Sequence, residues 1–303
     1  MRRNVKKNAA PKTGSLKTVS IPISGSSLLE VENLTVTFQT VRGPVDVVKD
    51  SSFRIEPGKT LGIVGESGSG KSMTSLAIMG LLPDGGATTG RIRFFGHDLL
   101  DRSDHEMRRV RGEKIAMIFQ DPLSSLNPYF TVGLQISEAY RAHRGGSKRD
   151  GRRVAIDAMR RVKIADPEHR VDHYPHQFSG GMRQRIMIAM ALCLEPDLII
   201  ADEPTTALDV TVQAQILELM TELQKETGTG MLFITHDLAV VSEVADDVLV
   251  MQNGETREHA PVAEIFSNPQ SSYTKALLDA VPRITDVVGD IRAVDESKGV
   301  SNE

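Results

Sequence analysis

The sequence predicts an α/β fold built on a mostly parallel sheet, and three observations support it. Short apolar runs alternate along the chain with longer segments of helical periodicity. Several runs are apolar almost throughout, which is typical of parallel strands buried on both faces. One run is followed by a glycine-rich segment and then by a helical one. Such folds bind ligands where the strands end, so we expect functional side chains there.

Four continuous apolar runs predict the central strands, and each ends in glycine or in polar residues. They are 60–65 (TLGIVG), 114–120 (KIAMIFQ), 197–204 (DLIIADEP) and 230–237 (GMLFITHD). Residues 28–40 alternate apolar and polar side chains, as expected for a half-buried strand, and 91–96 indicate an edge or hairpin strand. The Asn253-Gly254 pair predicts a tight hairpin turn within 251–255.

Between about residues 122 and 176 the strand signals stop. Residues 131–144 and 148–162 predict two helices joined by Gly145-Gly146, and apolar side chains share one helical face over 211–227. We therefore expect a core over 28–265 that contains a helical subdomain at about 122–195. We expect a disordered basic tail (1–27) before the core and an extension (266–303) after it.

Composition excludes several classes of protein. The formal net charge of −4 does not favour a general polyanion binder. Cys193 is the only cysteine, which excludes an internal disulfide and a four-cysteine metal site, and we expect this thiol to be inert. No run reaches the roughly 18 apolar residues of a membrane span. The tail lacks the apolar region of a secretory signal, and Pro11 and Gly14 would interrupt an amphipathic transit helix.

Residues 65–72 (GESGSGKS) have the spacing of a phosphate-binding loop. Its glycines let backbone N–H groups turn toward phosphate oxygens, and the N-terminus of the following helix attracts anions. The lysine can reach the β- and γ-phosphates, and the last serine can ligate Mg²⁺. We expect the whole loop to contact the nucleotide: Gly65, Glu66, Ser67, Gly68, Ser69, Gly70, Lys71 and Ser72.

Three of the predicted strands end in side chains suited to phosphate chemistry. Asp202 and Glu203 follow the apolar residues LIIA. One carboxylate can hold Mg²⁺, and the other can polarise a water molecule as general base. Gln120 ends a second strand and His236 a third. A lone glutamine or histidine at such a position is more often structural, but three strand ends of this kind together favour a role at the γ-phosphate.

Six motifs in chain order identify a family. They are GESGSGKS (65–72), IFQDP (118–122), FSGGMRQR (178–185), LIIADEP (198–204), TALD (206–209) and ITHD (234–237). Together they resemble the ATP-binding subunits of ABC transporters over about residues 28–266. The resemblance implies the P-loop NTPase fold of ABC ATPases, with an antiparallel β subdomain beside the parallel core. It also implies that ATP is bound and hydrolysed with Mg²⁺.

The resemblance assigns roles at the phosphate end of the site. Three residues would be catalytic: a water-activating acid, a histidine that stabilises the transferring phosphoryl group, and a glutamine that is also a metal ligand. The metal ligands would overlap with this set. The catalytic residues are Glu203, His236 and Gln120, and the metal ligands are Ser72, Gln120 and Asp202.

The third motif, called the signature here, implies a site shared between two chains. In the family two ATP-binding domains pack head to tail, so Ser179, Gly180 and Gly181 would contact the γ-phosphate held by the partner. Asp209, from TALD, would join the same nucleotide site. The motif departs from its commonest form at two flanking positions, but its Ser-Gly-Gly is intact. The aromatic side chain that stacks on adenine stays unassigned, with Phe38 nearby.

A narrower resemblance is to the peptide/nickel importers of the family. It rests on residues 119–136 (FQDPLSSLNPYFTVGLQI), on 176–192 and on 266–282, which carry the spacing Pro-x-x-x-Tyr-Thr-x-x-Leu from Pro269 to Leu277. It implies as partners a second ATP-binding subunit, two transmembrane permeases and an extracytoplasmic solute-binding protein, and no nucleic acid. The chain would lie peripherally on the cytoplasmic face of the inner membrane. Some relatives hold an iron–sulfur cluster in the extension, which here contains no cysteine.

Alternatives to peptide import stay open. An exporter subunit is one, although exporters often carry the permease in the same chain. A soluble ABC ATPase that acts on nucleic acid or ribosomes is another, although such proteins usually carry coiled-coil or zinc insertions or two ATP domains. Among importers the solute could be a dipeptide, an oligopeptide, nickel, glutathione or a related small molecule, because the ATP-binding subunit does not contact it.

Overall fold

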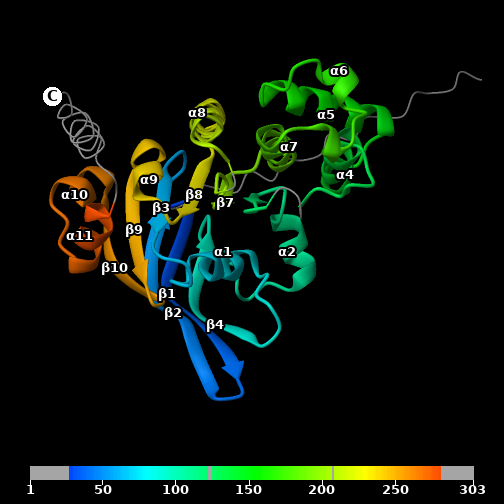
Figure 1. Ribbon diagram of the computed structural model, residues 1–303. Coiled ribbons are helices and arrows are strands. Elements are labelled where there is room, and N and C mark those ends of the chain that lie inside the picture. The colour runs from blue at the N-terminus through cyan, green and yellow to red at the C-terminus, as the bar shows by residue number, and fades with distance from the viewer. Residues whose placement is uncertain (1–26, 122–124, 207, 281–303) are drawn as a thin grey trace, which may run out of the picture.

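The computed structural model describes residues 27–121, 125–206 and 208–280. The expected tail at 1–27 lies outside the described residues except for its last position, and so does 281–303 of the expected extension. One sheet runs through the described molecule, with the strand order β5-β4-β1-β2-β10-β9-β3-β8-β7-β6. A group of helices stands at one side of this sheet (Figure 1).

The parallel part of the sheet matches the predicted central strands. It consists of β9 (Asp247–Gln252), β3 (Thr60–Val64), β8 (Gly230–Thr235), β7 (Leu198–Asp202) and β6 (Ile115–Ile118). The last four lie within the four apolar runs, so those predictions are confirmed. β3, β7 and β8 are buried along their whole length, as expected for strands covered on both faces.

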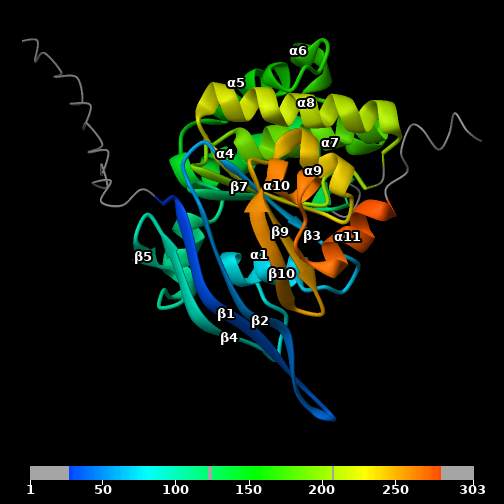
Figure 2. The same ribbon diagram turned by 90° about the vertical axis from the view of Figure 1, so that its left-hand side faces the viewer.

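The other half of the sheet is antiparallel. β1 (Leu29–Thr40) pairs with β2 (Gly43–Ile55) and with β4 (Gly86–Phe94), and β5 (His97–Asp98) closes a short hairpin at the edge. β10 (Glu255–Pro261) pairs antiparallel with β9 and meets β2 through one parallel bridge, so it joins the two halves. The β1–β2 hairpin projects beyond the rest of the molecule (Figure 2).

Sequence analysis did not predict β2. Its residues, GPVDVVKDSSFRI, begin with Gly-Pro and contain Asp-Ser-Ser, which are typical of turns. The strand forms because its apolar residues pair with β1 and pack in the core, where Val48, Phe53 and Ile55 are buried. Long-range pairing therefore outweighs the local preference.

Helices follow the predicted order. The two helices expected around Gly145-Gly146 are α4 and α5, and α5 begins with a capping box between Ser147 and Asp150. With α6 and α7 they form the group beside the sheet in Figure 1. The helices are α1 (Lys71–Met79), α2 (Asp104–Val110), α4 (Val132–Arg144), α5 (Lys148–Arg161), α6 (Pro167–Arg170), α7 (Gly180–Leu192), α8 (Val210–Thr227), α9 (Leu238–Val244), α10 (Val262–Ser267) and α11 (Ser272–Asp279).

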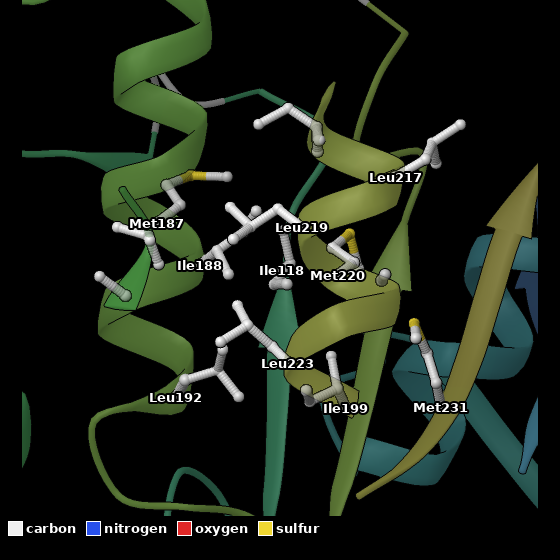
Figure 3. Close-up of a cluster of buried hydrophobic side chains, with 14 of the residues drawn as sticks. Ile118, Met187, Ile188, Leu192, Ile199, Leu217, Leu219, Met220, Leu223 and Met231 are labelled. Atoms are coloured by element: carbon white, nitrogen blue, oxygen red, sulfur yellow. The ribbon is translucent and has the colours of Figure 1, made fainter. Parts of the chain in front are cut away.

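Two hydrophobic clusters lie on opposite faces of the sheet. Successive residues of β7 alternate between them, with Leu198 and Ile200 in one cluster and Ile199 in the other. The first cluster contains α1 and the antiparallel strands. The second contains α7, α8 and α9, and Figure 3 shows side chains of α7 and α8 meeting Ile199 above the strands. The helical group and the sheet thus share one continuous core.

Candidate nucleotide-binding site

The phosphate loop (residues 65–72) connects the end of β3 to the start of α1. Glycine is required at two of its positions because strands approach the backbone closely. A Cβ on Gly65 would lie 2.1 Å from the carbonyl oxygen of Met251, and one on Gly70 would lie 2.5 Å from that of Val47. Gly70 also has φ +104°, which disfavours other residues. The loop is therefore held against β2 and β9.

Lys71 is buried at the N-terminus of α1 and bonds to its own loop. Its Nζ donates to the carbonyl oxygens of Gly65 (2.7 Å) and Glu66 (2.9 Å). Burial lowers the pKa of Lys71, while the charges of Glu203 and Asp202 oppose that shift. A buried cation next to a helix N-terminus is suited to the negative charge of phosphate.

Ser72 and Asp202 bring two oxygen donors together from different elements. Ser72 Oγ donates a hydrogen bond to Asp202 Oδ1 at 3.0 Å. Burial raises the pKa of Asp202 although the bond from Ser72 lowers it. Mg²⁺ in phosphate sites takes few protein ligands and fills its shell with water and phosphate oxygens, so this donor pair fits the ion. Ser69 Oγ is buried and has no hydrogen-bond partner among the described residues, as expected of a phosphate donor.

The carboxylate of Glu203 collects three polar neighbours on one oxygen. Its Oε2 accepts hydrogen bonds from Gln120 Nε2 (3.0 Å) and Thr206 Oγ1 (2.9 Å), and His236 Nδ1 lies 3.4 Å away. The backbone of Glu203 is left-handed, with φ +47°, and its N–H donates to the carbonyl of Ile234. Such a conformation is strained for a residue with a side chain, and strain of this kind often occurs at functional sites.

These groups surround a cavity of about 830 Å³, which is large enough for a nucleotide. It contains most of the site residues that the sequence predicts from the phosphate loop and the strand ends. Two of the expected residues, Gly65 and Asp202, are not in its lining, although Asp202 bonds to Ser72, which is. The lining consists of Phe38, Val47, Glu66, Ser67, Gly68, Ser69, Gly70, Lys71, Ser72, Met73, Gln120, Glu203, His236 and Leu277.

Sequence reasoning missed several of these residues. Val47 comes from the unpredicted β2, and Phe38, on β1, was noted only as a neighbour of the expected adenine contact. Thr206, which bonds to Glu203 but is not in the lining, is the first residue of the TALD motif and could have been suspected on that ground. Leu277 is the last residue of the Pro-x-x-x-Tyr-Thr-x-x-Leu spacing in the extension, and that spacing could have indicated its place in the site.

The signature turn (residues 179–181) lies elsewhere in the chain and does not line this cavity. Ser179 is the N-cap of α7, and its Oγ accepts a hydrogen bond from the N–H of Met182 at 3.4 Å. A Cβ on Gly181 would lie 2.5 Å from Cγ1 of Val212, so the turn packs against α8. Both ribbon views separate α7 from α1 (Figures 1 and 2).

Asp209 is also outside the cavity lining. Its Oδ1 accepts a hydrogen bond from the N–H of Val212 at 3.0 Å, which makes Asp209 the N-cap of α8. Its expected contact with a nucleotide stays a prediction.

The described residues contain no cluster of three or more His, Cys, Asp or Glu side chains arranged to hold a metal ion. None of their helices combines the length and the apolar character needed to span a membrane.

Comparison with known proteins agrees with the motifs. A family model described as ABC transporter matches residues 48–206. The chain is 54% identical to the dipeptide transport ATP-binding protein DppD of Bacillus subtilis over 259 residues, which are 85% of this chain and 77% of DppD. It is 48% identical to the oligopeptide transport ATP-binding protein OppD of Escherichia coli over 272 residues, which are 89% of this chain and 81% of OppD.

Solved structures share the fold. One is MJ0796, described as a bacterial ABC transporter cassette of dimeric structure, with a TM-score of 0.68, 27% identity, and coverage of 77% of this chain and 98% of MJ0796. Another is cbiO1 of Clostridium perfringens, with a TM-score of 0.70, 28% identity, and coverage of 88% of this chain and 100% of cbiO1.

Proposed function

Because the chain belongs to the ABC transporter family, we propose that it is the ATP-binding subunit of an importer that takes up peptides or a related small solute. Hydrolysis of ATP coupled to transport is the activity of this family. The narrower assignment is supported by the relatives named above, which are dipeptide and oligopeptide transport ATP-binding proteins.

Glu203 is the proposed general base. Oε2 already accepts hydrogen bonds from Gln120 and Thr206, whereas Oε1 accepts none from the described residues. Oε1 can therefore take a proton from the attacking water while Oε2 stays fixed. His236, beside the same carboxylate, can donate to an oxygen of the transferring γ-phosphoryl group. Mg²⁺ held by Ser72 and Asp202, with Gln120 nearby, would neutralise charge on the phosphates.

The proposal includes a second ATP-binding subunit. The signature turn is a helix N-terminus that carries backbone N–H groups, yet it does not line the cavity of its own chain. A partner's signature turn, brought against the phosphate loop, would add donors to the γ-phosphate. The dimeric MJ0796 cassette, which shares the fold, supports such an arrangement. The partner could be a second copy or a similar chain.

The observation that carries the transport assignment is the position of two consecutive residues. Gln120 lines the nucleotide cavity, while Phe119 lines a second, mostly apolar cavity of about 520 Å³ between β6, α4 and α7. Ala142 and Met190 line that cavity too, and we name it the docking groove. An apolar helix from a permease fits such a groove. Movement of Gln120 during hydrolysis would then be transmitted directly to the permease.

From this follow the proposed partners and location. Two transmembrane permeases would each bind a docking groove of the ATP-binding dimer, and an extracytoplasmic solute-binding protein would select the solute. Contact with the permeases would hold the chain at the cytoplasmic face of the inner membrane as a peripheral subunit.

An affinity experiment tests this proposal. A tagged Glu203→Gln chain is expressed in its native cell, isolated with ATP and Mg²⁺, and its companions are identified by mass spectrometry. We expect two permeases and a second ATP-binding subunit, and the neighbouring solute-binding protein can then be screened for peptide binding. Recovery with ribosomes or nucleic acid and without a permease would contradict the proposal, and a permease without any solute-binding protein would favour an exporter.

A matched pair of variants tests the docking groove. Ala142→Glu adds a charge within the groove, whereas Ala263→Glu adds the same charge on exposed α10. We expect only the first to lose the permeases during isolation, while both keep ATP binding. Retention of the permeases by Ala142→Glu would contradict the assigned groove.

A further inference from the structure

The C-terminal extension reaches the phosphate loop, and the roles proposed above do not include this contact. α11 begins just after Pro269 and carries the remaining residues of the spacing motif, Tyr273, Thr274 and Leu277. In Figure 2 the helix lies beside β10. The phenol oxygen of Tyr273 accepts a hydrogen bond from the backbone N–H of Glu66 at 3.3 Å, across 207 positions of sequence.

This hydrogen bond holds one particular peptide group. The N–H of Glu66 and the carbonyl of Gly65 belong to the same planar unit. Its N–H donates to Tyr273, and its carbonyl oxygen accepts from Lys71 Nζ at 2.7 Å. A rotation of this peptide would therefore disturb both bonds. Tyr273 and Lys71 are coupled through a single rigid group.

The helix that carries Tyr273 is itself fixed to the sheet. The carboxylate of Glu258, on β10, accepts hydrogen bonds from the N–H groups of Gln270 (2.7 Å) and Ser271 (3.0 Å), just before α11. Thr274 is completely buried, and Tyr273 and Leu277 pack against the core. Burial also raises the pKa of Tyr273, so its hydroxyl stays protonated at neutral pH. α11 can thus act as a fixed support for the loop.

The loop has a second support at Ser69. The N–H of Gly254, in the β9–β10 turn, donates to the carbonyl of Ser69 at 3.0 Å. Leu277, one turn after Tyr273, lines the nucleotide cavity. The extension therefore contributes one hydrogen bond to the loop and one side chain to the cavity.

We propose that Tyr273 is a positioning residue of the ATP site, which sets the peptide between Gly65 and Glu66 and through it the phosphate loop and Lys71. The spacing motif of the extension, from Pro269 to Leu277, then belongs to the nucleotide site. This inference rests on the proposed role of the phosphate loop and is independent of the transported solute.

The test compares variants of the full-length chain by their affinity for ADP, which is not hydrolysed, and by their thermal unfolding midpoints. Tyr273→Phe removes only the hydroxyl. We expect the Kd for ADP to rise about threefold to tenfold, the effect of one net hydrogen bond, with the midpoint nearly unchanged. Tyr129→Phe removes a hydroxyl from an exposed side chain and should change neither quantity.

A second control separates positioning from a general loosening of the helix. Leu278→Ala shortens a side chain of α11 that packs on the core but does not line the cavity. It should lower the unfolding midpoint and leave the Kd unchanged. An unchanged Kd in Tyr273→Phe, or an equal rise in Leu278→Ala, would overturn the inference.

Lys71→Ala serves as the reference for the site itself. If it also binds ADP normally, the proposed nucleotide site is wrong, whereas a loss in Lys71→Ala alone rejects only the role of Tyr273.

Discussion

The phosphate loop and the signature turn both place glycines at the start of a helix, and they differ in what surrounds them. The loop is pressed against β2 and β9, and Lys71, Glu203 and His236 stand around it. The signature turn packs on Val212, and its Ser179 caps its own helix. The local motif is similar, but only the first site has the cavity, the buried cation and the acids that hydrolysis needs.

That difference is consistent with the proposal that one chain holds two unequal halves of a shared site. In this proposal the loop half carries the chemistry, and the signature half offers donors without a cavity of its own. If each half is completed by a partner, damage to the loop should impair catalysis or affinity within the chain. Damage to the signature turn should impair only the nucleotide site that contains the partner's phosphate loop. The predictions below test the loop half first, in order of expected effect.

The largest effect is expected from Glu203→Gln. The amide keeps the size of the side chain but cannot take a proton from water, so ATP turnover should fall about 10²- to 10⁴-fold while ATP binding persists. Phosphate release and equilibrium binding measure the two quantities. The exposed Glu226→Gln is the matched control. Turnover near the wild-type value would show that Glu203 is not the base.

Lys71→Ala should act on affinity. The substitution removes a buried cation whose charge-assisted bonds to phosphate are worth about 1.5–3 kcal/mol, so the Kd for ATP should rise about 10- to 150-fold. Calorimetry checks this, with Lys225→Ala, an exposed lysine of α8, as the control. An equal rise of the Kd for ATP in Lys71→Ala and Lys225→Ala would mean that the nucleotide is attracted by any lysine charge and not by this site.

Phe38→Ala should weaken binding less. Phe38 and Val47 line the cavity from the antiparallel strands, and a stacked aromatic ring is worth about 1–3 kcal/mol per base. We expect the Kd for ADP to rise about tenfold and the Kd for inorganic phosphate to stay the same. Val45→Ala, exposed on the same hairpin, is the control. A normal Kd for ADP in Phe38→Ala would leave the adenine contact to other residues.

The smallest effect is expected at the other end of the signature helix. Burial raises the pKa of Cys193 to about 12, so only about one thiol in 10⁴ is ionised at pH 8. Because the thiolate is the reactive form, alkylation by a maleimide should be far slower than in the unfolded chain and should accelerate as pH rises. Cys193→Ser should keep wild-type ATPase activity. Rapid labelling at pH 8 would show that the folded thiol is accessible and ionised.

Much of this site could be predicted from sequence because its residues follow the ends of strands or stand at the first positions of helices. The buried strands β3, β7 and β8 are read directly from continuous apolar runs, and their ends fix the positions of Lys71, Glu203 and His236. Pairwise contacts could not be predicted in this way. The bond from Gln120 to Glu203 joins residues 83 positions apart, and it depends on how β6 and β7 align in the sheet.

The residues of the site that the sequence did not predict were missed for one shared reason. Val47 belongs to β2, whose turn-like residues fold into a strand only because β1 pairs with them. Tyr273 reaches Glu66 only because α11 packs against β10. Both contacts depend on long-range packing, which local patterns do not encode.

The most direct test of the shared site is complementation in vitro between two inactive chains. Lys71→Ala damages the loop and keeps the signature, whereas Ser179→Arg damages the signature and keeps the loop. In a homodimer of either variant, both composite sites contain one damaged half. In a mixed dimer one site contains both damaged halves and the other is intact. We predict that each variant alone is nearly inactive, relative to a wild-type chain that hydrolyses ATP, and that mixing restores a substantial part of the activity. Full activity of Ser179→Arg alone, or no recovery on mixing, would contradict a site shared between two chains.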